Sequence, residues 1–405
     1  MIQILWISSC APSRKAKEAG GQTYQYYFNE ILKDDEFEIR LISLGDANRK
    51  EELENEFKGI EKKFIYSDGN LFSKLRKLTN IESMFNPWNK HAGLISNYCA
   101  SVMIDTTVKY KATGYVPNII ILEWTNTVVL AKQLHDIFPE SKIVASEHDV
   151  TFVGYKRKAE YYKGINRLFW KIKYKNEKRI ELNSLKLCEL VLPHNADNKK
   201  ILMKEGISEN RIMSLVPYFN NMSSNKRKSN QRDILFFGAM ARMENSLSAL
   251  WFIEHVMPLL TDLDVRFVVL GSNPTEELKA RENSKICVTG FVDSIEPYFE
   301  ESMCLVAPLV LGAGIKVKII EALSSGIPVL TNDIGIEGIP AKNERDYYHC
   351  MTPQEYAEVI RKIYRKESDV DFLESNAKKL VREHFSIEQS LRAYKDRLVY
   401  IGGNT

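Results

Sequence analysis

Short runs of apolar, β-branched residues recur along the chain, and each is followed by a polar or glycine-rich turn and a segment of helix length. Apolar runs without alternating polar positions are typical of strands that are buried on both faces of a parallel sheet. In the first half, the predicted strands are Ile2–Ser8, Glu38–Leu44, Asn118–Trp124, Lys142–Ser146 and Glu189–His194. In the second half, they are Ile234–Phe237, Arg266–Gly271, Ile286–Thr289, Cys304–Pro308 and Pro328–Thr331. Two such series predict two doubly wound α/β domains.

A polar stretch separates the two series. Residues 220–231 are rich in Ser, Asn and charged residues and contain one apolar side chain, Met222, as expected of a solvated linker. We therefore expect Rossmann-like domains at residues 1–215 and 216–385. Apolar residues recur with a helical period in Ser386–Ile401, which predicts a terminal helix, within residues 386–405, that crosses back to the N-terminal domain.

Composition narrows the class of protein. The 405 residues are 44% hydrophobic and 27% charged, which excludes collagen-like and wholly disordered chains. The 56 Lys and Arg residues against 53 Asp and Glu residues give a net charge of +3, which argues against a dedicated nucleic-acid binder. The six Cys residues have no close spacing, so we expect reduced thiols in a cytoplasmic protein. The chain begins with a predicted strand rather than a signal peptide, and no apolar run approaches the ~18 residues of a membrane span.

Residues suited to anion binding are concentrated between positions 307 and 340. A predicted strand ends at Pro308, and Gly312 and Gly314 lead into a predicted helix that ends at Gly326. Glycines in such a turn let backbone N–H groups approach an anion, and the helix N-terminus adds a partial positive charge. Lys316 and Lys318 add full charges nearby. The pattern suits a diphosphate.

Glu321 completes this pattern. It follows Gly314 by seven residues, or about two helical turns, so we expect the two residues to share one face of the helix. A carboxylate there can accept both hydroxyl groups of a ribose, which predicts a nucleotide-diphosphate pocket at the carboxyl edge of a parallel sheet. The alternative is a structural helix in which Glu321 pairs with Lys318.

Three segments, in this order, resemble the retaining glycosyltransferases of the GT-B fold that form glycosyltransferase family 4. Ile234–Trp251 resembles the family's "ILFVGxMxxxxNxxAxxWF", residues 290–299 resemble "GFVxDxxPYxxxAD", and Ala307–Pro340 resembles "GGGxRLKxLEAMAxGxPVV". The resemblance implies two doubly wound Rossmann-like domains facing a cleft, the first for the acceptor and the second for the donor. It also implies metal-independent transfer of a sugar, with retention of configuration, from a nucleotide-diphosphate sugar to a glycan or lipid-linked acceptor. Polysaccharide biosynthesis at the cell surface, with no cofactor besides the nucleotide-sugar substrate, is the implied role.

The resemblance also implies which residues carry the chemistry. The catalytic candidates are His148, which follows the strand Lys142–Ser146, and Lys318. The donor-binding candidates are Gly238, Arg242, Asn245, Gly314, Ile315, Lys316 and Glu321. Gly20 and Gly21, in a loop before a predicted helix at Tyr24–Leu32, are expected to border the donor phosphates and the acceptor. Glu123 is a weaker candidate for the same site, whereas Asn195 and Asp197 are expected to cap a helix.

The sequence departs from the family pattern at three positions. Ala313 stands where many members have a glutamate that holds the donor sugar, and Ala239 follows Gly238 where they have arginine. Glu244 lies at or near the position of a phosphate-binding lysine. A non-catalytic nucleotide-sugar-binding subunit of the same fold therefore remains the alternative.

Residues 155–178 form a second distinctive segment, in which Lys and Arg alternate with Tyr, Phe and Trp. Basic helices with interleaved aromatic residues can rest on an anionic membrane surface, as an enzyme with a lipid-linked acceptor requires. The alternatives are a solvated helix with an apolar underside and RNA binding, although the near-neutral total charge argues against RNA, and we expect no nucleic-acid partner. Residues 74–78 and 85–88 are a smaller basic and aromatic companion.

Overall fold

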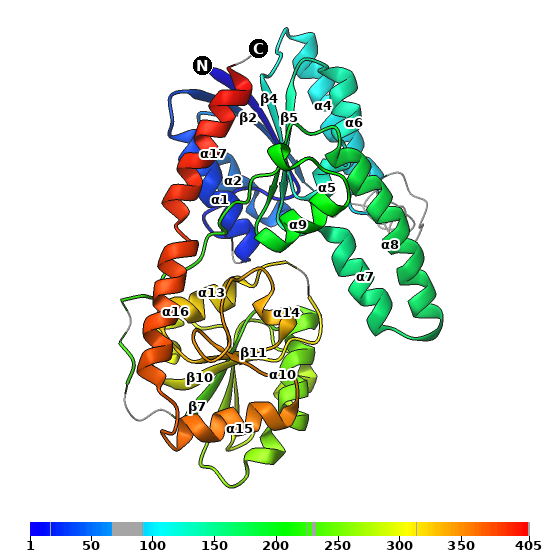
Figure 1. The fold of residues 1–405 in the computed structure, drawn as a ribbon. Coiled ribbons are helices and arrows are strands. Elements are labelled where there is room, and N and C mark those ends of the chain that lie inside the picture. Colours follow the sequence, from blue (N-terminus) through cyan, green and yellow to red (C-terminus); the bar gives the residue numbers. More distant parts are fainter. Residues whose placement is uncertain are drawn as a thin grey trace. The chain divides into compact units, whose positions relative to one another are not determined.

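The structure, a computed structural model, describes residues 1–16, 18–66, 91, 93–224, 226–228, 232–312 and 314–403. The chain divides into two compact units, Met1–Tyr218 with Ile387–Thr405, and Phe219–Ser386. Each unit contains a six-stranded sheet with helices packed around it (Figure 1). All the strand pairs in both sheets are parallel, so the α/β class predicted from the apolar runs is confirmed.

The sheet of the first unit has the strand order β3-β2-β1-β4-β5-β6. Its strands are β1 (Ile2–Ser8), β2 (Phe37–Gly45), β3 (Glu61–Tyr66), β4 (Ile119–Glu123), β5 (Lys142–Glu147) and β6 (Leu190–Pro193). Its helices are α1 (Ala19–Leu32), α2 (Lys50–Glu56), α4 (Asn97–Ala112), α5 (Thr125–Val128), α6 (Ala131–Ile137), α7 (Thr151–Tyr161), α8 (Gly164–Leu185), α9 (Ala196–Lys204) and α17 (Ile387–Gly402). The apolar pattern missed β3 because this edge strand begins with three charged residues, two of which are exposed.

The sheet of the second unit has the order β12-β11-β10-β7-β8-β9. Its strands are β7 (Asp233–Phe237), β8 (Arg266–Leu270), β9 (Ile286–Gly290), β10 (Ser302–Ala307), β11 (Val329–Thr331) and β12 (Tyr348–His349). Its helices are α10 (Met243–His255), α11 (Glu276–Lys279), α12 (Glu296–Glu301), α13 (Val317–Ser325), α14 (Asp333–Ile336), α15 (Pro353–Tyr364) and α16 (Val370–His384). The sequence did not predict β12, whose two residues are too few for a detectable pattern.

The first strand of each unit lies inside its sheet. β1 pairs with β2 on one side and β4 on the other, and β7 pairs in the same way with β8 and β10. The side chains of Ile4, Leu5, Trp6 and Ile7 are at most 1% exposed, which explains the unbroken apolar run in β1. The order of the strands reverses beside β1 and beside β7, and open α/β sheets bind their ligands at such reversals.

The C-terminal helix α17 packs on the first unit. Its apolar face buries Tyr394, Leu398 and Ile401 in the core that includes β1 and α1. The ring of Tyr394 meets Tyr27 edge to face at 5.8 Å, and the hydroxyl groups of Tyr27 and Ser390 are hydrogen-bonded at 2.7 Å. The last segment of the chain is therefore an integral part of the N-terminal unit.

Three buried carboxyl groups lie where α7 and α8 join the sheet. Glu181, on α8, accepts hydrogen bonds from the backbone N–H groups of Thr151 and Phe152, both at 3.1 Å, and so caps the start of α7. Burial raises the pKa values of Glu147 and Glu181 well above their ordinary value. Burial, assisted by the charge of Glu147, also raises the pKa of Glu177 to about 8. Several of these groups therefore retain protons at neutral pH.

This cluster predicts a stability that falls as the pH rises. The folded state holds the Glu177 proton up to a pH of about 8, whereas the unfolded chain releases it near the ordinary value of 4.5. The contribution of Glu177 is therefore complete below the unfolded pKa and is lost between these two pH values. Glu177→Gln should reduce the slope of unfolding free energy against pH, by up to about 1 kcal/mol per pH unit, in denaturant titrations. Glu160→Gln, on the exposed part of α7, is the control, and an unchanged slope in Glu177→Gln would contradict the prediction.

Candidate functional site

The residues singled out in the sequence gather at the carboxyl edges of the two sheets. In the first unit, Glu123 ends β4 and His148 directly follows β5, while α1 begins after the loop that leaves β1. In the second unit, Gly238 directly follows β7, and Gly314 lies between β10 and α13. Both groups therefore lie at the points where the strand order reverses.

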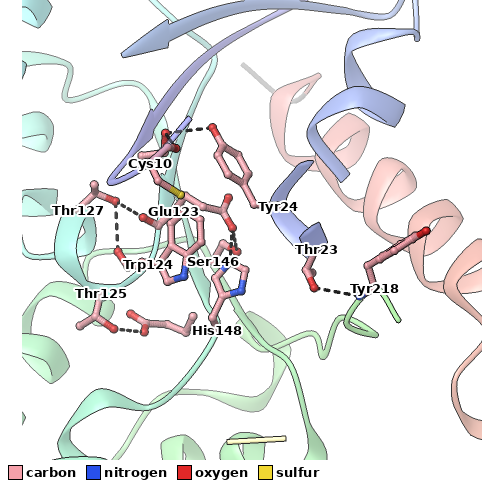
Figure 2. A network of polar contacts seen from close by, with 12 residues as sticks. Cys10, Thr23, Tyr24, Glu123, Trp124, Thr125, Thr127, Ser146, His148 and Tyr218 are labelled. Atoms are coloured by element: carbon pink, nitrogen blue, oxygen red, sulfur yellow. Dashed lines mark hydrogen bonds and ion pairs between the residues drawn. The ribbon is translucent and has the colours of Figure 1, made fainter. Parts of the chain in front are cut away.

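A buried carboxylate organises the edge of the first sheet. Glu123, which is 3% exposed, accepts hydrogen bonds from Trp6 Nε1 at 3.0 Å and from the Ser146 hydroxyl at 2.6 Å. His148 Nε2 lies 2.7 Å from the same carboxylate (Figure 2). An ionised carboxylate only accepts hydrogen bonds, so this contact favours the tautomer of neutral His148 in which Nε2 carries the proton. The other ring nitrogen, Nδ1, then has a lone pair.

The ring of His148 is fixed by stacking on both of its faces. Trp124 stacks at 4.5 Å between ring centroids and His194 at 4.4 Å. Burial, with a smaller effect of His148, lowers the pKa of His194 well below its ordinary value, so His194 is a neutral partner at physiological pH. Trp124 has a φ of 67°, a backbone conformation that is uncommon for a bulky residue. The sequence suggested His148 and Glu123 separately, and the structure joins them in one hydrogen-bonded pair.

Gly20 and Gly21 are not in a loop, as the sequence suggested, but in the first turn of α1. A Cβ atom at Gly20 would lie 3.4 Å from His148 Nδ1 and 3.5 Å from Trp124 Nε1. At Gly21 it would lie 3.1 Å from the Cβ atom of Ala16. The loop placement is therefore wrong, and a Cβ atom at Gly20 would make only an ordinary van der Waals contact with the His148 ring. The expected role of the two glycines beside the donor phosphates and the acceptor stays a prediction.

The two residues considered as caps have the expected positions. The Asn195 side chain accepts the backbone N–H of Asn198 at 2.7 Å and caps α9, and Asp197 lies in the first turn of that helix. The capping prediction is confirmed for Asn195.

At the edge of the second sheet, Lys318 is a partly buried lysine whose contacts are with neutral groups. Its Nζ donates to Asn245 Oδ1 at 2.9 Å and lies 4.6 Å from the centre of the Phe236 ring. Among the described residues, no carboxylate lies within ion-pair distance of this nitrogen. Burial, followed by the charges of Lys316 and Arg242, lowers the pKa of Lys318 to about 7.

Asn245 connects Lys318 to the turn after β7. Its Nδ2 donates to the carbonyl of Ala239 at 2.9 Å, while its oxygen accepts from Lys318. Gly238 has a φ of 155°, and a Cβ atom there would lie 2.7 Å from Asn245 Nδ2. Glycine is therefore needed for the close approach between this turn and α10.

The segment before α13 differs from the expectation. The helix begins at Val317, so Gly314, Ile315 and Lys316 precede it, and the count of two helical turns between Gly314 and Glu321 is wrong. Lys316 donates to the carbonyl of Gly314 and also lies 3.4 Å from Glu337 Oε2, so a carboxylate already balances part of its charge. The helix ends, as predicted, at Gly326, whose φ is 80°. Ala313 lies outside the described residues.

Glu321 does not form the ion pair with Lys318 that the sequence allowed. Its Oε1 accepts the backbone N–H of Asn220 at 3.1 Å. Burial raises the pKa of Glu321 to about 7, partly offset by this hydrogen bond. Arg242, by contrast, has a 62% exposed side chain that lies 3.9 Å from Glu244. The second unit thus holds two ionisable groups whose pKa values lie near 7, the buried Glu321 and the partly buried Lys318.

Neither metal ligation nor membrane spanning is evident in the part of the chain that the structure describes. No cluster of three or more His, Cys, Asp or Glu residues there is arranged to hold a metal ion. None of the helices it contains has the length and apolar character needed to cross a bilayer. All six Cys residues are free thiols.

The Glu123–His148 pair predicts a defined tautomer. In the wild-type protein, ¹⁵N chemical shifts of neutral His148 should show Nε2 protonated and Nδ1 unprotonated. Glu123→Gln should shift the population toward a mixture of tautomers, since an amide can donate as well as accept. Ser146→Ala is the matched control: it removes one donor but keeps the carboxylate, so the wild-type tautomer should persist. A wild-type spectrum with Nδ1 protonated would refute the assignment.

Comparison with known proteins extends these observations. Residues 231–366 match the model of the family described as "Glycosyl transferases group 1". A comparison with curated proteins found no match.

Solved structures show the same fold over the whole chain. Sucrose-phosphate synthase from Thermosynechococcus elongatus is 13% identical, with a TM-score of 0.70 and complete coverage of both chains. HepE from Anabaena, solved with UDP, is 13% identical, with a TM-score of 0.67 over 98% of this chain and 100% of its own. A glycosyltransferase from Rickettsia africae is 17% identical, with a TM-score of 0.65 over 100% of this chain and 99% of its own. The chain therefore has the GT-B fold, and most of its second unit resembles group 1 glycosyl transferases.

Proposed function

We propose that the chain is a glycosyltransferase that moves a sugar from a nucleotide-diphosphate sugar to a glycan or lipid-linked glycan. We further propose that it retains the anomeric configuration, needs no metal ion, and serves the synthesis of a cell-surface polysaccharide. The observation that carries the proposal is Lys318, a partly buried lysine hydrogen-bonded to Asn245, at the carboxyl edge of the sheet in the unit that matches the transferase family. The Anabaena neighbour, which was solved with UDP-glucose, supports a donor of this class.

The second unit has the groups that a nucleotide diphosphate requires. A diphosphate would supply the counter-charge for Lys318, and the N-terminus of α13 would add N–H groups and a partial positive charge. The exposed Arg242 would contribute a further cation. Glu321, once ionised, would accept the ribose hydroxyl groups. The turns at Gly238 and Gly314, with Ile315 and Lys316, would bring the backbone close to the phosphates.

The proposed reaction exchanges one bond at the anomeric carbon for another. The bond from this carbon to the diphosphate oxygen breaks, and a bond to the acceptor oxygen forms on the same face of the sugar. The acceptor proton passes to the departing phosphate. Because negative charge grows on the diphosphate, a cation such as Lys318, already placed in a site of low polarity, would stabilise the transition state.

We assign the acceptor and the reacting sugar to the edge of the first sheet. The Glu123–His148 contact would fix the imidazole with the Nδ1 lone pair available to a sugar hydroxyl. Gly20, at the start of α1, would leave room for substrate beside this ring, with Gly21 next to it in the same turn. His148 would then be a catalytic residue, and Glu123 would position it.

Donor binding should weaken on both the acidic and the alkaline side of neutral pH. Lys318 is charged below a pH of about 7 and Glu321 is ionised above about 7, so the association constant for a nucleotide sugar should be highest near neutral pH. Lys318→Met should weaken binding near neutral pH and remove the decrease in the association constant above a pH of about 7. Glu321→Gln should remove the decrease below a pH of about 7. Isothermal titration calorimetry with a panel of nucleotide sugars from pH 5.5 to 8.5 measures both effects, because the esterified diphosphate keeps its charge in this range.

Rates of sugar transfer complete the test. Lys318→Met should transfer sugar at least about 100-fold more slowly than wild type, a loss typical of a group that stabilises charge in the transition state. Glu321→Gln, which loses the ribose contact, should transfer more slowly at a donor concentration below its Kd. Lys279→Met, which removes an exposed lysine of the same unit, should transfer at the wild-type rate. Wild-type rates in Lys318→Met and Glu321→Gln would refute the donor site. Donor binding without transfer or hydrolysis would instead favour the non-catalytic binding subunit.

A further inference from the structure

The basic and aromatic segment at residues 155–178 forms parts of two helices rather than one. α7 and α8 run antiparallel and pack on each other, joined by a turn at residues 162–163. The two helices form a hairpin whose tip extends away from the strands of its own unit (Figure 1). We call residues 156–175 the hairpin tip.

The hairpin tip exposes large apolar side chains. Ile165 is 83% exposed and Leu168 is 58% exposed, and these residues lie three apart on α8, so they share one side of that helix. Tyr161, at the end of α7, is 48% exposed. Exposed aliphatic and aromatic side chains grouped at the end of a projecting element are typical of a surface that contacts another phase or molecule.

Positive charge surrounds these apolar side chains. The tip contains eight Lys and Arg residues and one acidic residue, Glu160, for a net charge of +7. Arg167, Lys171 and Lys175 are all exposed and follow one another at intervals of four, so they form a row along α8 beside Leu168. The whole chain, with a net charge of +3, is otherwise slightly acidic, so the charge is concentrated here.

We propose that the hairpin tip docks on a membrane surface that contains anionic phospholipids. Ile165 and Leu168 would enter the boundary between headgroups and acyl chains, while the row of cations would contact the lipid phosphates. The docking goes beyond sugar transfer and does not require it, so it can be tested without donor or acceptor.

The arrangement of the rings argues against RNA as the occupant. Single-stranded RNA is bound by stacking of bases on exposed aromatic faces. Here, Lys158 lies 4.9 Å from the ring centre of Trp170 and Lys173 lies 5.3 Å from that of Tyr155, so these faces already carry cations of the protein. The most exposed apolar side chains, Ile165 and Leu168, are aliphatic and offer no stacking surface. A second copy of the tip would be repelled by the charge of +7.

Vesicle sedimentation of the full chain tests the proposal. Wild type should bind vesicles of phosphatidylcholine with phosphatidylglycerol at low salt and should bind pure phosphatidylcholine vesicles at least about 10-fold more weakly. The triple variant Arg167→Gln, Lys171→Gln, Lys175→Gln should bind the anionic vesicles on the order of 100-fold more weakly. Ile165→Ser with Leu168→Ser should weaken binding at least about 10-fold while keeping the charge.

A triple variant outside the hairpin is the matched control. Lys132→Gln, Lys200→Gln, Lys204→Gln removes the same charge from exposed positions on α6 and α9 and should bind within about two-fold of wild type. All the substitutions are on the surface, and equal melting temperatures would show that the variants are folded. Equal binding by the hairpin triple variant and the control variant would overturn the proposal. It would also be overturned if wild type retained RNA oligonucleotides or self-associated through the tip without binding anionic vesicles.

Discussion

Both sheets are parallel, and the first strand of each unit lies between two later strands. This arrangement determines where polar and ionisable side chains can lie. Connections that leave β1 and β4 go to opposite faces of the first sheet, as do those that leave β7 and β10 in the second, so no crossover helix covers the edge between them. The strands end at this edge, so their last backbone N–H and C=O groups need hydrogen-bond partners from side chains, helix N-termini or a ligand. Every candidate group, from Glu123 and His148 to Lys318, lies at or beside such an edge.

The two edges satisfy this requirement differently. In the first unit, the protein supplies the partners: Trp6, Ser146 and His148 all contact Glu123, and two aromatic rings hold the imidazole. In the second unit, the partly buried Lys318 and the buried Glu321 form hydrogen bonds with neutral groups, the side chain of Asn245 and the backbone of Asn220. A buried charge without an opposite charge is costly. The first edge is therefore organised by contacts within the protein, whereas at the second edge desolvation lowers the pKa of Lys318 and raises that of Glu321, both to about 7.

The sequence predicted the strands that have continuous apolar runs. It did not predict the edge strands that lack such runs, or the contacts between residues far apart in the chain. Ten strands were predicted because their residues are apolar on both faces, while the edge strands β3 and β12 lack that pattern. Gly20 and Gly21 were placed in a loop because glycine has a low helix propensity, whereas the structure has them in the first turn of α1. The contacts from Glu123 to His148 and from Asn245 to Lys318 join residues that lie on different elements. Fold resemblance suggested some of these residues, but only the packing of the strands and helices brings each pair within hydrogen-bonding distance.

The hairpin and the candidate catalytic histidine are parts of one continuous structure. β5 ends at Glu147, His148 follows, and α7 begins at Thr151, so the segment with His148 connects the sheet to the hairpin. At the hairpin's root, Glu181 of α8 accepts the first N–H groups of α7, and Thr125 donates to Glu147 at 2.5 Å. The hydroxyl groups of Thr125 and Thr151 are also hydrogen-bonded at 2.8 Å, so these contacts link α8 to α7 and the start of α7 to the end of β5, next to His148. Docking of the tip would therefore orient the edge of the first sheet with respect to a surface, as an enzyme with a lipid-linked acceptor needs.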